Sequence, residues 1–231
     1  MLVTVENHLI ELLPRKDRVR LRSIGRPVEL VLRDVLSEPG KPTRYVYFPT
    51  EGFISLVAQI EGSNGVEVGM VGREGMLGAH LALGIRAAPL HGLVQGAGAA
   101  WRIGAADFRK ELEGSFALQK CMQRYVYVLM TQLATSVACL RFHLIAPRLA
   151  RWLLMSQDRA RSDSFVITHQ FLAYMLGVRR VGITMAAGAL YREGLIDYRR
   201  GHFIVLDRRG LEAAACGCYA ADVRAYRRMT N

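Results

Sequence analysis

Two adjacent arginines, Arg179 and Arg180, are the residues whose type and position indicate the most specific chemistry. A guanidinium group presents a rigid fork of N–H donors. That fork matches the O6 and N7 acceptors of guanine in the major groove of DNA. The arginines are useful for this chemistry only if a helix holds them at an exposed end, so the flanking sequence decides the interpretation.

The flanking residues predict a helix-turn-helix. Thr168 is a good N-cap for a helix that runs to Met175 or Leu176. Gly177 then fits a tight turn, where a residue with a β-carbon would be strained. Arg179 and Arg180 open a second helix that ends near Gly194. In such a motif the second helix enters the major groove with its N-terminal residues at the base edges. The predicted base-reading residues are Arg179, Arg180, Val181, Gly182, Thr184 and Met185.

A basic β-hairpin is predicted directly after this motif. The runs LIDYRR and HFIVLD read as two short strands joined around Gly201. Basic side chains at the hairpin tip could contact phosphates, which fix the register of a protein on DNA without reading its sequence. The predicted phosphate-binding residues are Thr168, His169, Arg199, Arg200 and His202.

Apolar residues are spaced to pack the two helices against a third. They are Leu172, Ala173, Leu176, Val178, Ile183 and Leu190. The alternative for any single match of this kind is a structural helical hairpin. Small residues at the turn, paired arginines and a basic hairpin occur together here, and this combination favours DNA binding.

The N-terminal part of the chain has a β-rich texture. Residues 1–24 predict a short helical segment that Pro14 interrupts. From Val28 to Ile103, short runs rich in Val, Ile, Tyr and Phe alternate with turn residues, which is typical of a β-sandwich or barrel. The dipeptide Asn64-Gly65 predicts a hairpin between two of these runs.

A long helix is predicted from Phe108 to Leu140, and it carries two apolar stripes. Two stripes suggest two buried faces, one against the chain's own β-domain and one against a second copy. The alternative is a core helix of a single domain. The predicted dimer-helix residues are Met122, Tyr125, Val126, Leu129, Met130, Leu133 and Val137.

The four cysteines suggest neither disulfides nor a metal site. They are Cys121, Cys139, Cys216 and Cys218. A cytoplasmic chain of this size does not need disulfides. No residue near Cys216-Gly-Cys218 in the sequence completes a four-ligand set with the usual zinc spacing, so we expect two thiols on or after a short helix.

Charge and composition agree with a nucleic-acid partner. The 231 residues carry a formal charge of +11, and residues 141–231 hold 15 Lys and Arg against 7 Asp and Glu. Such an excess favours a polyanion as the binding partner.

We expect a cytoplasmic protein with no membrane partner. The longest apolar run, Tyr125–Leu140, is interrupted by polar residues, and the N-terminal sequence does not resemble a signal peptide. No catalytic triad, metal spacing or phosphate loop suggests an enzyme.

Taken together, these segments resemble the Crp/Fnr superfamily of bacterial transcription regulators. The match is best from Ile167-Thr168-His169-Gln170 through Leu195-Ile196. The resemblance implies an α+β chain with a cyclic-nucleotide-binding-like jelly roll (residues 1–104), a dimerisation helix (105–141) and a winged helix-turn-helix (142–231). It also implies double-stranded DNA and a second copy of the chain as partners, with RNA polymerase as a further candidate.

In the β half, the resemblance implies an effector pocket at the family's phosphate-binding cassette. Its residues would be Glu74, Gly75, Met76, Leu77, Gly78 and Arg86. Met76 stands where cyclic-AMP-binding members have a glutamate for the ribose hydroxyl, and a thioether cannot replace a carboxylate there. We therefore expect no cofactor, and a small-molecule effector other than cyclic AMP if there is one.

Other departures narrow the family properties that this chain can share. No cysteine precedes Cys121, which argues against the N-terminal iron–sulfur cluster of some members. His80 or His91 could serve as a haem ligand, although an ordinary surface or core histidine is the simpler interpretation. Arg180 aligns with the family's guanine-reading arginine, whereas Val181, Gly182 and Met185 depart from the usual recognition residues.

The sequence thus predicts a homodimeric regulator that reads an imperfect palindrome. Two alternatives remain at this stage. One is a small-molecule-binding signalling module with no DNA role, and the other is a constitutive regulator with a degenerate effector pocket.

Overall fold

The computed structural model describes residues 7–59 and 65–230 and forms two compact units. Of the described residues, the first comprises 7–56, 70–130 and 226–230, and the second comprises 57–59, 65–69 and 131–225. The boundary falls inside one long helix, between Met130 and Thr131. The predicted division at 104/105 and 141/142, by contrast, treats that helix as a separate segment. The predicted hairpin residue Asn64 lies outside the described residues.

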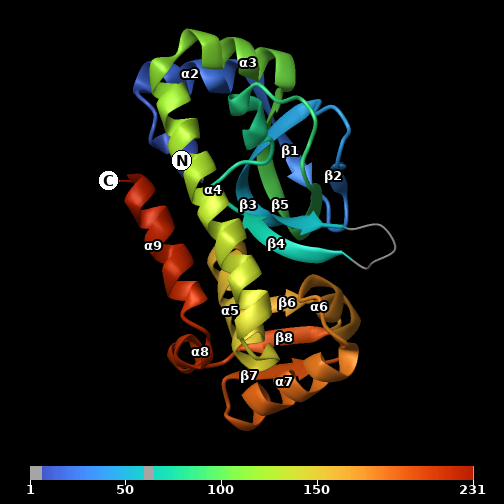
Figure 1. Cartoon of the computed structure of the whole chain (residues 1–231). Helices are drawn as coiled ribbons and strands as arrows, with labels where there is room; N and C mark the ends of the chain where they lie inside the picture. The colour runs from blue at the N-terminus through green and yellow to red at the C-terminus, as the bar shows by residue number, and fades with distance from the viewer. Residues whose placement is uncertain (1–6, 60–64, 231) are drawn as a thin grey trace. The chain divides into compact units, whose positions relative to one another are not determined.

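The N-terminal part of the chain forms a five-stranded sheet (Figure 1), most of which belongs to the first unit, whereas residues 66–69 of β4 are counted in the second. Two short helices precede it, and Pro14 separates them as expected because it takes the N-cap position of the second. Strand β1 pairs antiparallel with β5 in continuous register, from Gly25 opposite Ile103 to Leu30 opposite Gly98. The strand order in the sheet is β1-β5-β3-β4, and β2 also pairs with β5. The elements are α1 (His8–Glu11), α2 (Arg15–Ile24), β1 (Gly25–Leu30), β2 (Val35–Ser37), β3 (Tyr45–Ala58), β4 (Val66–Val71), η1 (Ala79–Leu83) and β5 (His91–Gly104).

The predicted helix from Phe108 to Leu140 is two helices in the structure. Helix α3 (Ala105–Gly114) ends at a glycine, and α4 (Phe116–Phe142) begins after Ser115. Ser115 has an extended backbone, and its hydroxyl accepts a hydrogen bond from the Leu118 amide at 3.1 Å. The break follows from this cap, because Gly114 weakens the helix and Ser115 satisfies an amide of the next one.

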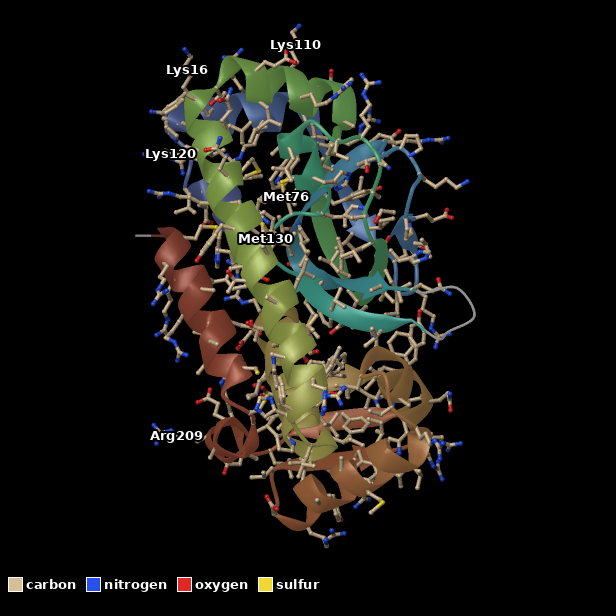
Figure 2. The ribbon with its side chains drawn as sticks, viewed as in Figure 1. Lys16, Met76, Lys110, Lys120, Met130 and Arg209 are labelled. Carbon is tan, nitrogen blue, oxygen red and sulfur yellow. The ribbon has the colours of Figure 1, made fainter. Side chains whose placement is uncertain are left out.

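Helix α4 presents one buried and one exposed apolar face. Met122 and Tyr125 are fully buried, whereas Met130 and Val137 keep 63% and 62% of their side-chain surface exposed. Figure 2 labels Met130 on this helix. Val126, Leu129 and Leu133 are half-buried. Within the described ranges, α4 is the helix that is long and apolar enough to cross a membrane by length and composition alone, a test that helices buried in soluble proteins also pass.

The second unit is built around helix α5 (Ile145–Ala160), whose Leu149 and Leu153 are fully buried. Its remaining elements are β6 (Ser164–Val166), α6 (His169–Met175), α7 (Arg180–Arg192), β7 (Ile196–Arg199), β8 (His202–Val205), α8 (Arg208–Ala214) and α9 (Cys218–Thr230). The three strands form a small antiparallel sheet in the order β6-β8-β7. The predicted packing residues of the two helices are buried, apart from half-buried Val178.

Candidate nucleic-acid interface

The turn between α6 and α7 has the geometry that the sequence predicts. The Thr168 hydroxyl caps α6 by accepting a hydrogen bond from the Phe171 amide at 3.1 Å. Gly177 has a φ of +61°, which a residue with a β-carbon adopts only at a cost. The buried Arg148 of α5 donates a hydrogen bond to the Leu176 carbonyl at the end of α6. This contact ties the turn to α5, and nothing in the local sequence signals it.

The first turns of α7 display a side-chain face to solvent. Arg179 is the N-cap residue of α7 and Arg180 is its first residue, and both are exposed. Val181 and Met185 are 63% and 70% exposed, although both are apolar. Thr184 is also exposed, and its hydroxyl donates to the Arg180 carbonyl at 3.2 Å. Five of the six predicted base-reading residues therefore lie at an accessible helix start.

Gly182, the sixth, faces the protein. A β-carbon at this position would lie 2.6 Å from Cδ1 of Ile145, at the start of α5. Gly182 thus lies where α7 closely approaches the end of the Ile145 side chain. Its role in reading a base stays a prediction.

His169, which is predicted to bind phosphate, is half-buried. Its Nδ1 lies 3.1 Å from the Thr184 hydroxyl, and its Nε2 is buried. The ring packs against Tyr198 and Phe203 at centroid distances of 5.1 and 5.6 Å. Burial lowers the pKa of the His169 imidazole, and the nearby charge of Arg180 lowers it further. His169 therefore positions Thr184 from within the protein.

The predicted wing is a tight hairpin between β7 and β8. Arg199 pairs with His202, so that Arg200 and Gly201 form a two-residue loop with φ values of +48° and +85°. Two positive φ values suit the twist of a short hairpin. Arg199, Arg200 and His202 are all exposed. Arg199 lies 3.8 Å from Asp197 in an open ion pair, which leaves its guanidinium accessible.

An aromatic cluster fixes the wing on the end of α7. Tyr198 stacks on Phe203 with their centroids 5.4 Å apart, and Tyr191 of α7 meets Tyr198 edge-on at 5.8 Å. The strands of the wing and the last turn of α7 are thus packed together. No role for these aromatic residues was predicted from the sequence. Only the placement of Tyr198 and Phe203 on strands, and of Tyr191 on α7, could have indicated one.

The residues predicted for an effector pocket are mostly packed inside the first unit. Met76 is 1% exposed (Figure 2), and the Tyr125 hydroxyl donates to its carbonyl at 3.2 Å. A β-carbon on Gly75 would lie 2.3 Å from the Tyr125 hydroxyl oxygen. Leu77 and Gly78 are buried, and Glu74 is half-buried with its carboxylate accepting from the Gly72 amide at 3.2 Å. Arg86 is exposed.

A different hollow occurs in the same unit, with a volume of about 510 Å³. It runs beside β2 and the segment leading into β3, and Lys41, Thr43 and Arg44 line it among others. None of the six predicted pocket residues belongs to its lining. His80 lies beside Thr43, with its Nε2 2.7 Å from the Thr43 hydroxyl oxygen. Burial lowers the pKa of the His80 imidazole.

Comparisons with known proteins agree with this architecture. Residues 147–214 match the family model of the Crp-like helix-turn-helix domain. A search of curated protein sequences finds no significant match.

Solved structures of Crp/Fnr regulators have the same fold. FixK2 from Bradyrhizobium japonicum superposes with a TM-score of 0.70 at 11% identity, over 84% of this chain and 98% of that one. A putative Crp/Fnr-family regulator from Eubacterium rectale gives 0.68 at 15% identity, over 89% and 96%. A Crp/Fnr-family regulator from Thermus thermophilus gives 0.67 at 22% identity, over 82% and 98%.

Fold and site together define a winged helix-turn-helix protein with a β-sheet unit before it in the chain. More narrowly, its C-terminal domain is a Crp-like helix-turn-helix domain, and the chain has the fold of the Crp/Fnr regulators. The resemblance noted from the sequence is confirmed at this level. These matches also agree with the expectation of a regulator rather than an enzyme.

Proposed function

We propose that this chain is a homodimeric transcription regulator that binds a palindromic DNA site in a sequence-specific manner. The observation that carries the proposal is the exposed start of α7, which bears Arg179 and Arg180 in the same unit as an exposed basic hairpin. Arg180 would read guanine, and the neighbouring exposed residues would contact base edges or thymine methyl groups.

The wing would bind the DNA backbone. Arg199, Arg200 and His202 form an exposed basic tip, and Tyr198 of the same hairpin packs against Tyr191 of α7. Their contacts would set the register of α7 in the groove without adding sequence information. Removing Arg200 should therefore weaken binding to all duplexes alike.

The exposed face of α4 supports pairing of two chains. Met130 and Val137 lie seven residues apart, or about two helical turns, and both are exposed apolar residues. A second copy of α4 would cover them along a two-fold seam. Two recognition helices related in this way would enter major grooves roughly 34 Å apart.

A small-molecule effector other than cyclic AMP would act on the first unit. Buried Met76 offers no carboxylate for a ribose hydroxyl, and Tyr125 occupies the space beside Gly75. Such an effector would shift the dimer between two arrangements of its DNA-binding units, provided that it binds one of them more tightly. The chain is proposed to work in the cytoplasm, with RNA polymerase as a candidate partner.

Selection of bound duplexes from a random pool tests the proposal. We expect an enriched site with two-fold symmetry and half-sites about one helical turn apart. Binding should fall steeply as the salt concentration rises, because phosphate contacts release counterions. A pool with no enriched sequence would contradict the proposal and favour a signalling module without a DNA role. Repeating the selection with cell extract would separate an effector-dependent regulator from a constitutive one.

A further inference from the structure

Three cysteines and a histidine that are far apart in the sequence converge in the second unit. Cys139 lies in the last turn of α4, and His143 follows the end of that helix. Cys216 and Cys218 flank the turn between α8 and α9. The four potential ligand atoms, three Sγ atoms and one imidazole nitrogen, all lie within 4.8 Å of one another.

The backbone holds both halves of this cluster in place. The His143 amide donates to the Cys139 carbonyl at 3.2 Å, which continues the helical pattern and puts the two side chains on one face. The Cys216 amide donates to the Pro147 carbonyl at 3.4 Å, and the Tyr219 amide donates to the Cys216 carbonyl at 3.1 Å. The convergence is therefore a product of secondary structure and turn geometry.

The spacing of the ligand atoms suits one tetrahedral metal ion. Zinc bonds of about 2.3 Å to sulfur and 2.0–2.1 Å to nitrogen place tetrahedral ligand atoms roughly 3.5–3.8 Å apart. The Sγ atoms of Cys139 and Cys216 are 3.5 Å apart, and Cys218 Sγ lies 3.6 Å from Nδ1 of His143. Small side-chain rotations would bring the remaining pairs to the same separation. An iron–sulfur cubane would need its thiolates farther apart, because the cluster itself lies between them.

The surrounding charges also suit a zinc–thiolate group. Three thiolates and a neutral imidazole around Zn²⁺ leave one net negative charge. Arg148 and Arg151 both interact electrostatically with Cys139 and Cys216. Arg151 forms a 2.6 Å ion pair with Asp222, whereas Arg148 donates to the uncharged Leu176 carbonyl. The charge of Arg148 is thus available to balance the thiolates.

We propose that Cys139, His143, Cys216 and Cys218 bind a structural zinc ion. Four protein ligands leave no open coordination position, which is the mark of a structural rather than a catalytic site. The ion would cross-link the end of α4 to the turn between α8 and α9, sites 77 residues apart at Cys139 and Cys216. No metal site was expected from the sequence, because no residue near Cys216 and Cys218 in the sequence completes a ligand set. The other two ligands, Cys139 and His143, lie at and just after the end of α4.

Two simpler interpretations compete with zinc. The cluster could be a set of free thiols, since its three cysteines form no disulfide in the structure. It could also form a disulfide between Cys139 and Cys216, whose Sγ atoms would have to approach from 3.5 Å to about 2.05 Å. A disulfide would leave Cys218 and His143 without a role.

The test is metal analysis of the full chain purified under reducing conditions. We expect one zinc per chain. Replacement by Co²⁺ should give the visible bands of a tetrahedral ion and sulfur-to-cobalt charge transfer in the near ultraviolet. Cys218→Ser and His143→Gln should each weaken Co²⁺ binding by more than the roughly 10–100-fold typical of losing a group that only orients a ligand. The matched controls Cys121→Ser and His91→Gln should bind as the wild type does.

Alkylation of the wild-type chain gives a second readout that does not depend on the folding of any variant. Bound zinc should protect Cys139, Cys216 and Cys218 from alkylation, and a chelator should expose them. The proposal is overturned if the reduced chain binds neither zinc nor Co²⁺, if it carries iron and sulfide, if zinc protects none of the three, or if folded variants bind as tightly as their controls.

Discussion

At the scale of single residues, the proposed DNA-binding surface depends on partly buried side chains behind it. His169 is the clearest case. Its ring packs on Tyr198 and Phe203 while its Nδ1 meets the Thr184 hydroxyl, so it joins the wing to the exposed face of α7. Burial, and then the charge of Arg180, lower the pKa of this imidazole.

A pH dependence of stability follows from this environment. Because the folded state lowers the pKa of His169, the unfolded chain binds the proton more readily. The free energy of unfolding should therefore fall as the pH drops below about 6.5, the ordinary value for histidine. Chemical denaturation between neutral and mildly acidic pH measures this. His169→Gln should flatten the fall, and a variant with the wild-type slope would contradict the assignment.

At the scale of secondary-structure elements, the turn between α6 and α7 decides where the arginines point. Gly177 has a left-handed backbone, and the Val178 amide returns to the Ala173 carbonyl at 2.9 Å. By contrast, Gly188 lies inside α7, where a β-carbon would meet only the end of Arg192 at an ordinary 3.6 Å. Gly177 therefore has a backbone conformation that disfavours a β-carbon, whereas Gly188 has a helical conformation and room for one.

The same substitution at these two sites should have opposite effects. Gly177→Ala should lower the free energy of unfolding by about 1–2 kcal/mol, the cost of a left-handed conformation for an L-residue. Gly188→Ala should raise it by roughly 0.5–1 kcal/mol, because alanine loses less entropy in a helix. Denaturant titration of both variants checks the pair. Equal effects of the same sign would mean that the turn does not have the described geometry.

Elements whose signals are local could be predicted from the sequence, and those set by distant contacts could not. Thr168, Gly177 and Arg180 define the two helices through capping and turn chemistry, and the structure confirms all three positions. The break at Ser115 has a local signal as well, but continuous apolar periodicity on both sides obscured it. The close approach of α7 at Gly182 depends on Ile145, which lies on another helix.

At the scale of the whole molecule, the proposed function requires two chains. The face of α4 that carries Met130 and Val137 is apolar and exposed in one chain, which costs free energy unless a second copy covers it. Two linked recognition helices bind a palindrome far more tightly than one helix binds a half-site, because the second contact becomes intramolecular.

Charged substitutions on this face should separate the chains. Met130→Glu combined with Val137→Glu should convert a dimer to a monomer in sedimentation, because two carboxylates would have to be buried at the seam. The monomer should lose affinity for the selected palindrome. Ile85→Glu is a suitable control, since Ile85 is also apolar and 56% exposed but lies outside α4. A double variant that stays dimeric would place the interface elsewhere.

The most direct test of the central claim is the affinity of Arg180→Ala for the selected duplex and for a scrambled duplex at one salt concentration. If the exposed arginine at the start of α7 reads a base, binding to the selected duplex should weaken by about 1–3 kcal/mol. Binding to the scrambled duplex should change much less, so the preference between the two should narrow. Unchanged affinity for the selected duplex, or an equal loss on both, would show that Arg180 does not read sequence and would contradict this account.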